Sequence, residues 1–370
     1  MSEIQESAAL PEPAPAQNVG LEDLPPVQPP SAGFIMQLFL IPAIIVGAVI
    51  GVWVMFGKLA GTQQDWGQLV QDLGSENEHR RWRAASGLAH MLNTDRERFK
   101  SFEDLTEEQR AELGEQTPLA TNPKVASELV GLFERQLQKK SKDGKHVTHQ
   151  EFLATTIGSL DLPDTVLPAL QKATEPTYNA KVRTSALRSI ALILNRAEER
   201  GEPIKSLPEL TETLIDATAT DNSEEESGLV KQVATYALGL VKTEESQSHL
   251  VSLLANADEM TQINAAIALT RVERTEGVEV FLEVLDIAKE KFDPKAMATL
   301  TEPKRLEARN RYQIEIPMML NNSLKALDGL ASKLTAEQKS LAIERLKPVA
   351  ANYEHTKLRK DAELLLDKLK

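Results

Sequence analysis

One spacing of apolar residues recurs from residue 65 to the C-terminus, and it constrains the fold more than any other feature of the chain. In each copy a polar residue is followed three and seven residues later by Ala, Leu or Ile, which is the period of an α-helix with one apolar face. Positions 153, 186, 234 and 265 match in successive copies and lie 33, 48 and 31 residues apart, a period of about 40 residues. The copies begin at Arg81, Gln150, Arg183, Lys231, Gln262 and Arg359, with a poorer match at Ser323.

Shorter apolar segments lie between these copies, and we interpret each as the first helix of a hairpin whose second helix is the recurring copy. Only 4% of residues are aromatic, and Ala and Leu dominate the apolar set, which suits close helix packing better than a β-sandwich. Because no hairpin can bury its apolar face alone, the hairpins are expected to stack around a common core. Thr335-x-x-Gln338 also predicts a capping box. The predicted first helices cover residues 66–73, 125–137, 166–173, 210–217, 249–254, 278–288 and 338–346.

Two of the copies carry the clearest likeness to a known family. KVRTSALRSI at residues 181–190 and INAAIAL at residues 263–269 resemble the Val-Arg-x-x-Ala-Ala-x-Ala-Leu signature of HEAT and HEAT-like (phycobilisome-lyase-type) repeats. The resemblance covers residues 65–370 and implies an all-α, armadillo-type α-solenoid that serves as a scaffold or docking surface, with second helices on its concave side. The Arg of the signature recurs only as Arg81, Arg183 and Arg359, so we expect stacking to depend mostly on apolar packing.

The chain before residue 65 divides into three segments of different composition. Residues 1–33 hold seven prolines, several acidic residues and no Lys or Arg, which predicts a disordered tail. Residues 34–56 contain no charge, and 23 helical residues would span roughly 34 Å, enough to cross a bilayer. A secretory signal peptide is disfavoured because the preceding residues are acidic. Residues 57–64 are then a juxtamembrane linker.

The predicted membrane helix suggests an orientation and a pairing face. Lys58 follows the helix and no basic residue precedes it, which favours a single-pass membrane protein with its repeat domain in the cytoplasm. Ala43, Gly47 and Gly51 recur every four residues, so they form a stripe on which another helix could pack closely. A homodimer through this stripe and incidental small residues are the two interpretations.

Patterns that carry chemistry are missing from the sequence. The formal net charge of −13 argues against nucleic-acid binding, and the absence of cysteine excludes thiolate chemistry. His146 and His149 stand three residues apart, but no third metal ligand is identifiable nearby. Because no serine-nucleophile, phosphate-binding or zinc-protease motif occurs, the sequence predicts a protein that is not an enzyme and has no cofactor or metal.

These features together favour a membrane-anchored scaffold or adaptor that binds unidentified proteins through its HEAT-like surface. The alternatives are a HEAT-like enzyme of the phycobilin-lyase type and an accessory subunit of a membrane complex. The helix register leaves Arg188 and Lys231 exposed, so they are the candidate partner-binding residues. Residues 95–117 and 292–309 interrupt the register and are interpreted as a charged helix and a polar loop.

Overall fold

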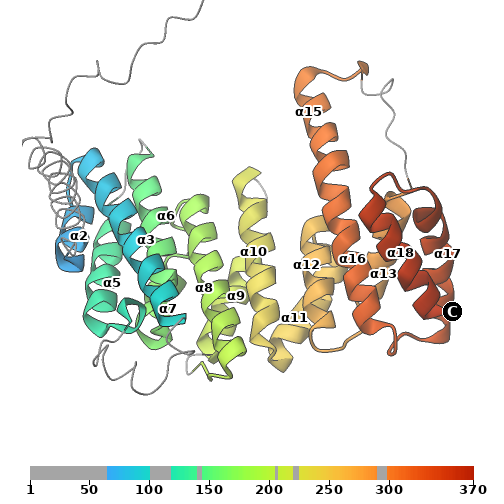
Figure 1. Ribbon diagram of the computed structural model, residues 1–370, viewed down its shortest axis with the longest axis horizontal. Coiled ribbons are helices and arrows are strands. Elements are labelled where there is room, and N and C mark those ends of the chain that lie inside the picture. The colour runs from blue at the N-terminus through green and yellow to red at the C-terminus, as the bar shows by residue number, and fades with distance from the viewer. Residues whose placement is uncertain (1–64, 101–117, 140–143, 205–206, 220–224, 290–297) are drawn as a thin grey trace, which may run out of the picture. The chain divides into compact units, whose positions relative to one another are not determined.

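The computed structural model describes residues 65–100, 118–139, 144–204, 207–219, 225–289 and 298–370, and this part of the chain is built from helices without a β-strand. These residues belong to one compact unit, Gln64–Lys370. Figure 1 shows the helices following one another as hairpins from α2 to α18. The all-α fold is therefore confirmed for the described residues, and the hairpins are compatible with HEAT-like repeats.

Each hairpin pairs a first helix with a second helix that packs against it. The first helices are α2 (Trp66–Leu73), α5 (Pro123–Leu137), α7 (Pro163–Lys172), α9 (Leu207–Thr218), α11 (Glu244–Asn256), α13 (Val278–Ile287) and α17 (Ala336–Asn352). The second helices are α3 (Glu78–Lys100), α6 (Lys145–Gly158), α8 (Ala180–Arg200), α10 (Glu225–Val241), α12 (Glu259–Thr270), α16 (Ile316–Leu330) and α18 (Thr356–Leu369). A short 3-10 helix, η1 (Leu119–Thr121), precedes α5.

Polar side chains at the predicted positions start several of these helices. Asn122 and Asn179 accept hydrogen bonds from the first backbone N–H groups of α5 and α8, and Asp258 does the same for α12. The capping box between Thr335 and Gln338 is confirmed, because each side chain bonds the other residue's backbone N–H. These caps satisfy N–H groups that have no partner within their own helix.

The core is continuous because α12 belongs to both of its parts. Ala265 and Leu269 pack with the buried side chains of the hairpins that precede α12. Ile263 and Ala266, on the other side of the same helix, pack with those of α13, α16, α17 and α18. Phe133 and Phe281 are the largest fully buried side chains, one in each part. The stack is thus held mainly by apolar burial.

Small residues let successive second helices approach closely. A Cβ atom on Gly158 of α6 would lie 2.3 Å from the Ser189 Cβ of α8, and one on Gly239 of α10 would lie 2.3 Å from the Ala268 Cβ of α12. Real Cβ atoms do not tolerate such distances. Glycine is therefore required at these two crossings for steric reasons, although its backbone is ordinary helix there.

One of the two predicted insertions differs from its prediction. Part of the predicted polar loop at 292–309 is the helix α15 (Glu302–Asn310), which continues through the π-helical turn η2 (Arg311–Glu315) into α16, as Figure 1 shows. Every residue type in α15 except Pro303 and Asn310 is a good helix former, and the proline lies in the first turn where it is tolerated. Of the predicted charged helix at 95–117, residues 95–100 belong to α3 and residues 101–117 lie outside the described part.

The expectations about a membrane need correction. No described helix is both long and apolar enough to cross a bilayer. The predicted span at 34–56, with Ala43, Gly47 and Gly51, lies outside the described residues, as do the tail at 1–33 and the linker at 57–64. The predicted single-pass membrane location with a cytoplasmic repeat domain is therefore corrected, since the described helices bury their apolar faces against one another and give it no support.

Candidate protein-binding surface

The exposed large apolar side chains gather on one row of helices. Among the described residues they lie on second helices or on the extension that leads into α16, and no first helix carries one. We call this surface the second-helix ridge. Its exposed apolar residues are Trp82 of α3, Leu192 of α8, Leu229 and Tyr236 of α10, Met318 of α16 and Leu364 of α18, with Leu306 and Ile314 on α15 and η2.

Two adjoining hollows run along the middle of this ridge. The first, about 420 Å³ between α8 and α10, is lined by Arg188, Leu192, Leu229 and Tyr236 among others. The second, about 360 Å³, lies between α10, α12 and α16. They share Tyr236 and Asn264 as lining residues, so they form one depression, which we call the α8–α16 groove.

Tyr236 stands at the junction of the two hollows and is fixed from both sides. Asn195 Nδ2 donates a hydrogen bond to Tyr236 Oη at 3.2 Å, and the Arg271 guanidinium carbon lies 4.9 Å from the ring centroid in a cation–π contact. Partial burial raises the pKa of Tyr236, but the hydrogen bond from Asn195 and the charge of Arg271 outweigh it, so the pKa lies below its usual value. The ring is thus held in place at the surface.

The groove is electropositive although the chain as a whole is acidic. Arg188, Arg271 and Lys325 are the charged residues among its lining, and no carboxylate lines either hollow. None of the three forms an ion pair with another described residue. The nearby Glu198 raises the pKa of Tyr236 only slightly, and its carboxylate is paired with Lys242. With a net charge of −13 on the chain, a strip of unpaired cations is unusual.

Farther along the ridge, lysines and aspartates occur together, and Lys325 is shared with the groove. A hollow of about 410 Å³ between α16 and α18 is lined by Lys325, Asp328, Lys357, Asp361 and Lys368 together with Leu364. Lys368 Nζ lies 2.6 Å from Asp328 Oδ1. Cations without a carboxylate among the lining residues are therefore a feature of the α8–α16 groove and not of this neighbouring hollow.

The structure separates the two predicted binding residues. Arg188 is exposed and lines the groove. Lys231 is half-buried and does not line the groove. Burial lowers the pKa of His249 on α11, and the positive charge of Lys231 lowers it further. Lys231 therefore lies on the side of α10 that faces the first helix α11. Reasoning from the sequence missed Tyr236, Arg271 and Lys325. Tyr236 could have been found from the helix period, because it lies between the buried positions Ala234 and Leu238, where an exposed polar side chain is expected and an aromatic one is unusual.

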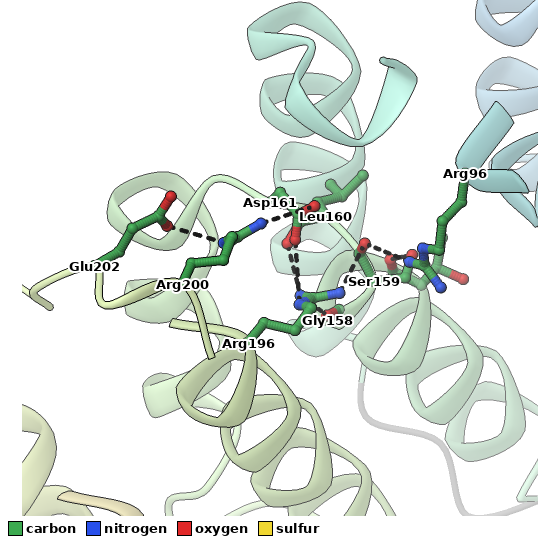
Figure 2. Close-up of polar contacts among 9 residues, drawn as sticks. Arg96, Gly158, Ser159, Leu160, Asp161, Arg196, Arg200 and Glu202 are labelled. Atoms are coloured by element: carbon green, nitrogen blue, oxygen red, sulfur yellow. Dashed lines mark hydrogen bonds and ion pairs between the residues drawn. The ribbon is translucent and has the colours of Figure 1, made fainter. Parts of the chain in front are cut away.

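Other arginines on the second helices have a structural task. Figure 2 shows Arg196 of α8 covering the C-terminal end of α6, where its Nη2 donates to the carbonyl oxygens of Gly158 and Leu160 at 2.7 and 2.9 Å. Its Nη1 donates to Ser159 O at 3.2 Å, and its Nε lies 3.1 Å from Asp161 Oδ1. Burial lowers the pKa of Arg196, while Asp161 offsets part of that effect.

A second arginine reaches the same helix end from the other side. Arg96 Nη2, on α3, donates to Ser159 O at 3.1 Å (Figure 2). Arg200 adds a contact to Asp161 at 3.3 Å and another to Glu202 at 3.1 Å. These groups satisfy the last carbonyl oxygens of α6 and oppose the negative end of its dipole. We call this arrangement the α6 arginine clamp.

The arginines of the repeat signature hold the turn of their own hairpin. Arg81 donates to Ser75 O and Glu76 O at 2.9 Å, Arg183 to Thr174 O at 3.0 Å, and Arg359 to Tyr353 O at 3.0 Å. Polar bonds between successive hairpins come from residues other than the signature arginines. Ser189 Oγ donates to Ala154 O at 2.9 Å, and Asn264 Nδ2 donates to Gln232 O at 3.1 Å.

A hollow between α3 and α6 contains a buried histidine. It measures about 410 Å³ and is lined by Trp82, Phe152, Arg81 and His149 among others. Burial, with smaller contributions from the charges of Arg81 and Lys139, lowers the pKa of His149 to about 4. Its Nε2 has no hydrogen-bond partner among the described residues. The imidazole is therefore neutral at neutral pH.

No family model matches the chain, and no curated protein matches it. A similar solved structure is that of human deoxyhypusine hydroxylase in complex with glycerol, with 15% sequence identity over 85% of this chain and 98% of that chain, and a TM-score of 0.26. The prediction that the chain is not an enzyme is corrected on this finding, because the similar structure belongs to an enzyme. At this TM-score, the similarity supports no conclusion about the fold, the substrate or the reaction of this chain.

Proposed function

We propose that residues 65–370 form a HEAT-like solenoid that works as an interaction scaffold or adaptor and binds another protein through the second-helix ridge. The supporting observation is the one-sided distribution of exposed apolar side chains: six of them lie on second helices, two on the α15–η2 extension and none on a described first helix. Single exposed apolar residues are ordinary, but residues aligned on one row of helices indicate a recognition surface.

The composition of the ridge also fits a protein partner. Tyr, Trp, Met and Arg are the residue types enriched at protein interfaces, and the ridge carries Tyr236, Trp82, Met318, Arg188 and Arg271. An interface of standard size covers about 800 Å² on each partner, more than one hollow can provide. A partner is therefore expected to contact several second helices at once.

Site-specific photocrosslinking tests this proposal. The photoreactive residue p-benzoylphenylalanine replaces Leu229 on α10 in the full chain, and in a second variant it replaces the exposed Glu212 on the first helix α9. We expect one defined adduct in the source cells from the Leu229 position and none from the Glu212 position. Equal adducts from both positions, or an adduct only from Glu212, would contradict the proposal.

A second candidate function rests on the hollow between α3 and α6. There a neutral imidazole, a guanidinium and two aromatic side chains line one space, which is the kind of setting that binds a small molecule by hydrogen bonds and stacking. A thermal-shift screen of small molecules tests it. A ligand that stabilises the full chain but not its His149→Gln variant would favour this function, and no such ligand would count against it.

A further inference from the structure

We propose that the α8–α16 groove recognises an acidic peptide segment that also carries apolar side chains, contributed by the partner protein. The inference rests on the proposed function and names the chemistry of the partner. Its basis is the combination, in one depression, of three cations without a carboxylate partner and a set of exposed apolar side chains.

The charges favour an anionic occupant. Arg188 lies in the first hollow, and Arg271 and Lys325 lie in the second, so the cations are distributed along the groove. In the α6 arginine clamp, by contrast, each guanidinium already faces carbonyl or carboxylate oxygens. Three acids near the groove are engaged elsewhere, since Glu198 pairs with Lys242, Glu259 with Arg311, and Asp328 with Lys368; a fourth, Asp361, lines the adjoining hollow together with Lys325. Carboxylates of a partner would therefore meet little opposing charge.

The apolar side chains favour a peptide over a purely ionic ligand. Leu192 and Leu229 are 45% and 41% exposed, and both line the first hollow beside the fixed ring of Tyr236. Leucine or aromatic side chains of a partner could cover these groups and gain burial at roughly 25 cal/mol per Å². A nucleic acid is a less suitable ligand, because its binding depends on many cations that contact successive phosphates, whereas the groove has three cations separated by leucine side chains.

The groove also sets the length of the segment. From α8 to α16 it crosses three helix-to-helix steps of about 8–10 Å each, roughly 27 Å in total. An extended peptide covers this span with about 8 residues and a helical one with about 18. The asparagine and glutamine side chains along the groove, from Asn195, Gln232, Asn264 and Asn322, add donors and acceptors that suit a polar backbone.

Peptide selection with charge-reversed variants tests the inference. A random library of peptides about 18 residues long is selected on the immobilised full chain, and binding of the enriched peptides is measured by fluorescence polarisation. We expect peptides that combine Asp or Glu with Leu, Ile or aromatic residues, whose binding weakens at high salt. The Arg271→Glu/Lys325→Glu variant should bind them at least about tenfold more weakly, a loss of about 1.4 kcal/mol.

A matched control keeps the same change in net charge. Lys124→Glu/Lys347→Glu reverses two exposed lysines on the first helices α5 and α17 and should bind the peptides like the unaltered chain. Enrichment of neutral or basic peptides, no enrichment, an equal effect of both variants, or displacement of the peptides by a single-stranded oligonucleotide would each overturn the inference. If the Leu229 crosslink survives such a result, the proposed function stands and only the chemistry of the partner is wrong; if the crosslink is also absent, both fail.

Discussion

The α6 arginine clamp and the α8–α16 groove lie next to each other along the second helices, and both contain arginines, yet these side chains do different things. Arg96 and Arg196 donate to the carbonyl oxygens at the end of α6. Arg271 lies over the ring of Tyr236 and faces no carboxylate among the described residues. The groups next to an arginine, and not its position in the repeat, therefore determine whether it stabilises the stack or is available to bind a partner.

Helix length explains the contrast. α6 has 14 residues, whereas its neighbours α3 and α8 have 23 and 21. The longer helices extend past the last turn of α6, so their arginines reach carbonyl groups that would otherwise lack partners. Arg271 is the C-cap residue of the 12-residue helix α12, and Arg188 lies in the middle of α8. Neither side chain donates a hydrogen bond to the end of another described helix.

Arg196→Met breaks the clamp and should give the largest effect. The substitution removes hydrogen bonds to three carbonyl groups and leaves Asp161 without its closest cation. Removing one partner of a buried polar network costs roughly 2–5 kcal/mol. Urea unfolding measures the loss, and Arg188→Met on the same helix is the control, with a change within about 0.5 kcal/mol. Equal losses for the two variants would remove the distinction between the regions.

His149, in the hollow between α3 and α6, should make the free energy of unfolding depend on pH. Its pKa is about 4 in the folded chain and 6.5 in the unfolded one, so the unfolded state binds more protons between these values. The stability that it contributes is complete above pH 6.5 and is lost as the pH falls toward 4, by at most about 3 kcal/mol at 1.36 kcal/mol per pH unit. Unfolding free energies of His149→Gln should lack this decline. Parallel pH curves for the two proteins would contradict the assignment.

Gly239→Ala tests the close packing beneath the groove. The new methyl group would meet the Ala268 Cβ, and such overpacking costs about 1–3 kcal/mol. This outweighs the helix-propensity gain of about 1 kcal/mol that alanine normally brings. In a double-mutant cycle, Ala268→Gly should relieve the clash, giving a favourable coupling of about 1 kcal/mol. Additive losses would show that the two helices do not touch there.

Arg271→Gln should have the smallest effect on stability, within about 0.5 kcal/mol, because the side chain lies at the surface. It removes the cation that favours the Tyr236 phenolate, so the pKa of Tyr236 should rise. A difference titration of tyrosine absorbance against the unaltered chain measures this rise, with Lys124→Gln as control. An unchanged titration would mean that Arg271 does not hold the ring.

The hairpins were predictable from the sequence, whereas the binding groove was not. Each predicted first helix from 66–73 to 338–346 overlaps an observed one, although several observed helices are longer, because burial of an apolar face imposes a helical period on the local sequence. The groove depends on which side chains of different hairpins meet. The repeat register grouped Lys231 with Arg188, but only packing shows that Lys231 lies toward α11. Tyr236 and Arg271 are 35 residues apart, so no local pattern joins them.

The extension α15 was missed for a related reason. Its nine residues bury nothing, so they carry no apolar period and look like a loop in the sequence. The helix forms because good helix formers continue the backbone hydrogen-bonding of α16 through η2. The α6 arginine clamp was equally invisible, since the contact between Arg96 and Ser159 spans 63 residues.

Thiol labelling tests most directly the central claim that the ridge, and not the first helices, faces a partner. The chain contains no cysteine, so single substitutions give clean probes. The labelling rates of Leu192→Cys and Leu229→Cys in the groove, relative to Glu212→Cys on α9, are compared between the purified full chain and a gentle lysate of the source cells. We expect a severalfold lower relative rate at both groove positions in the lysate. Unchanged relative rates in the groove, or protection of Glu212→Cys instead, would contradict it.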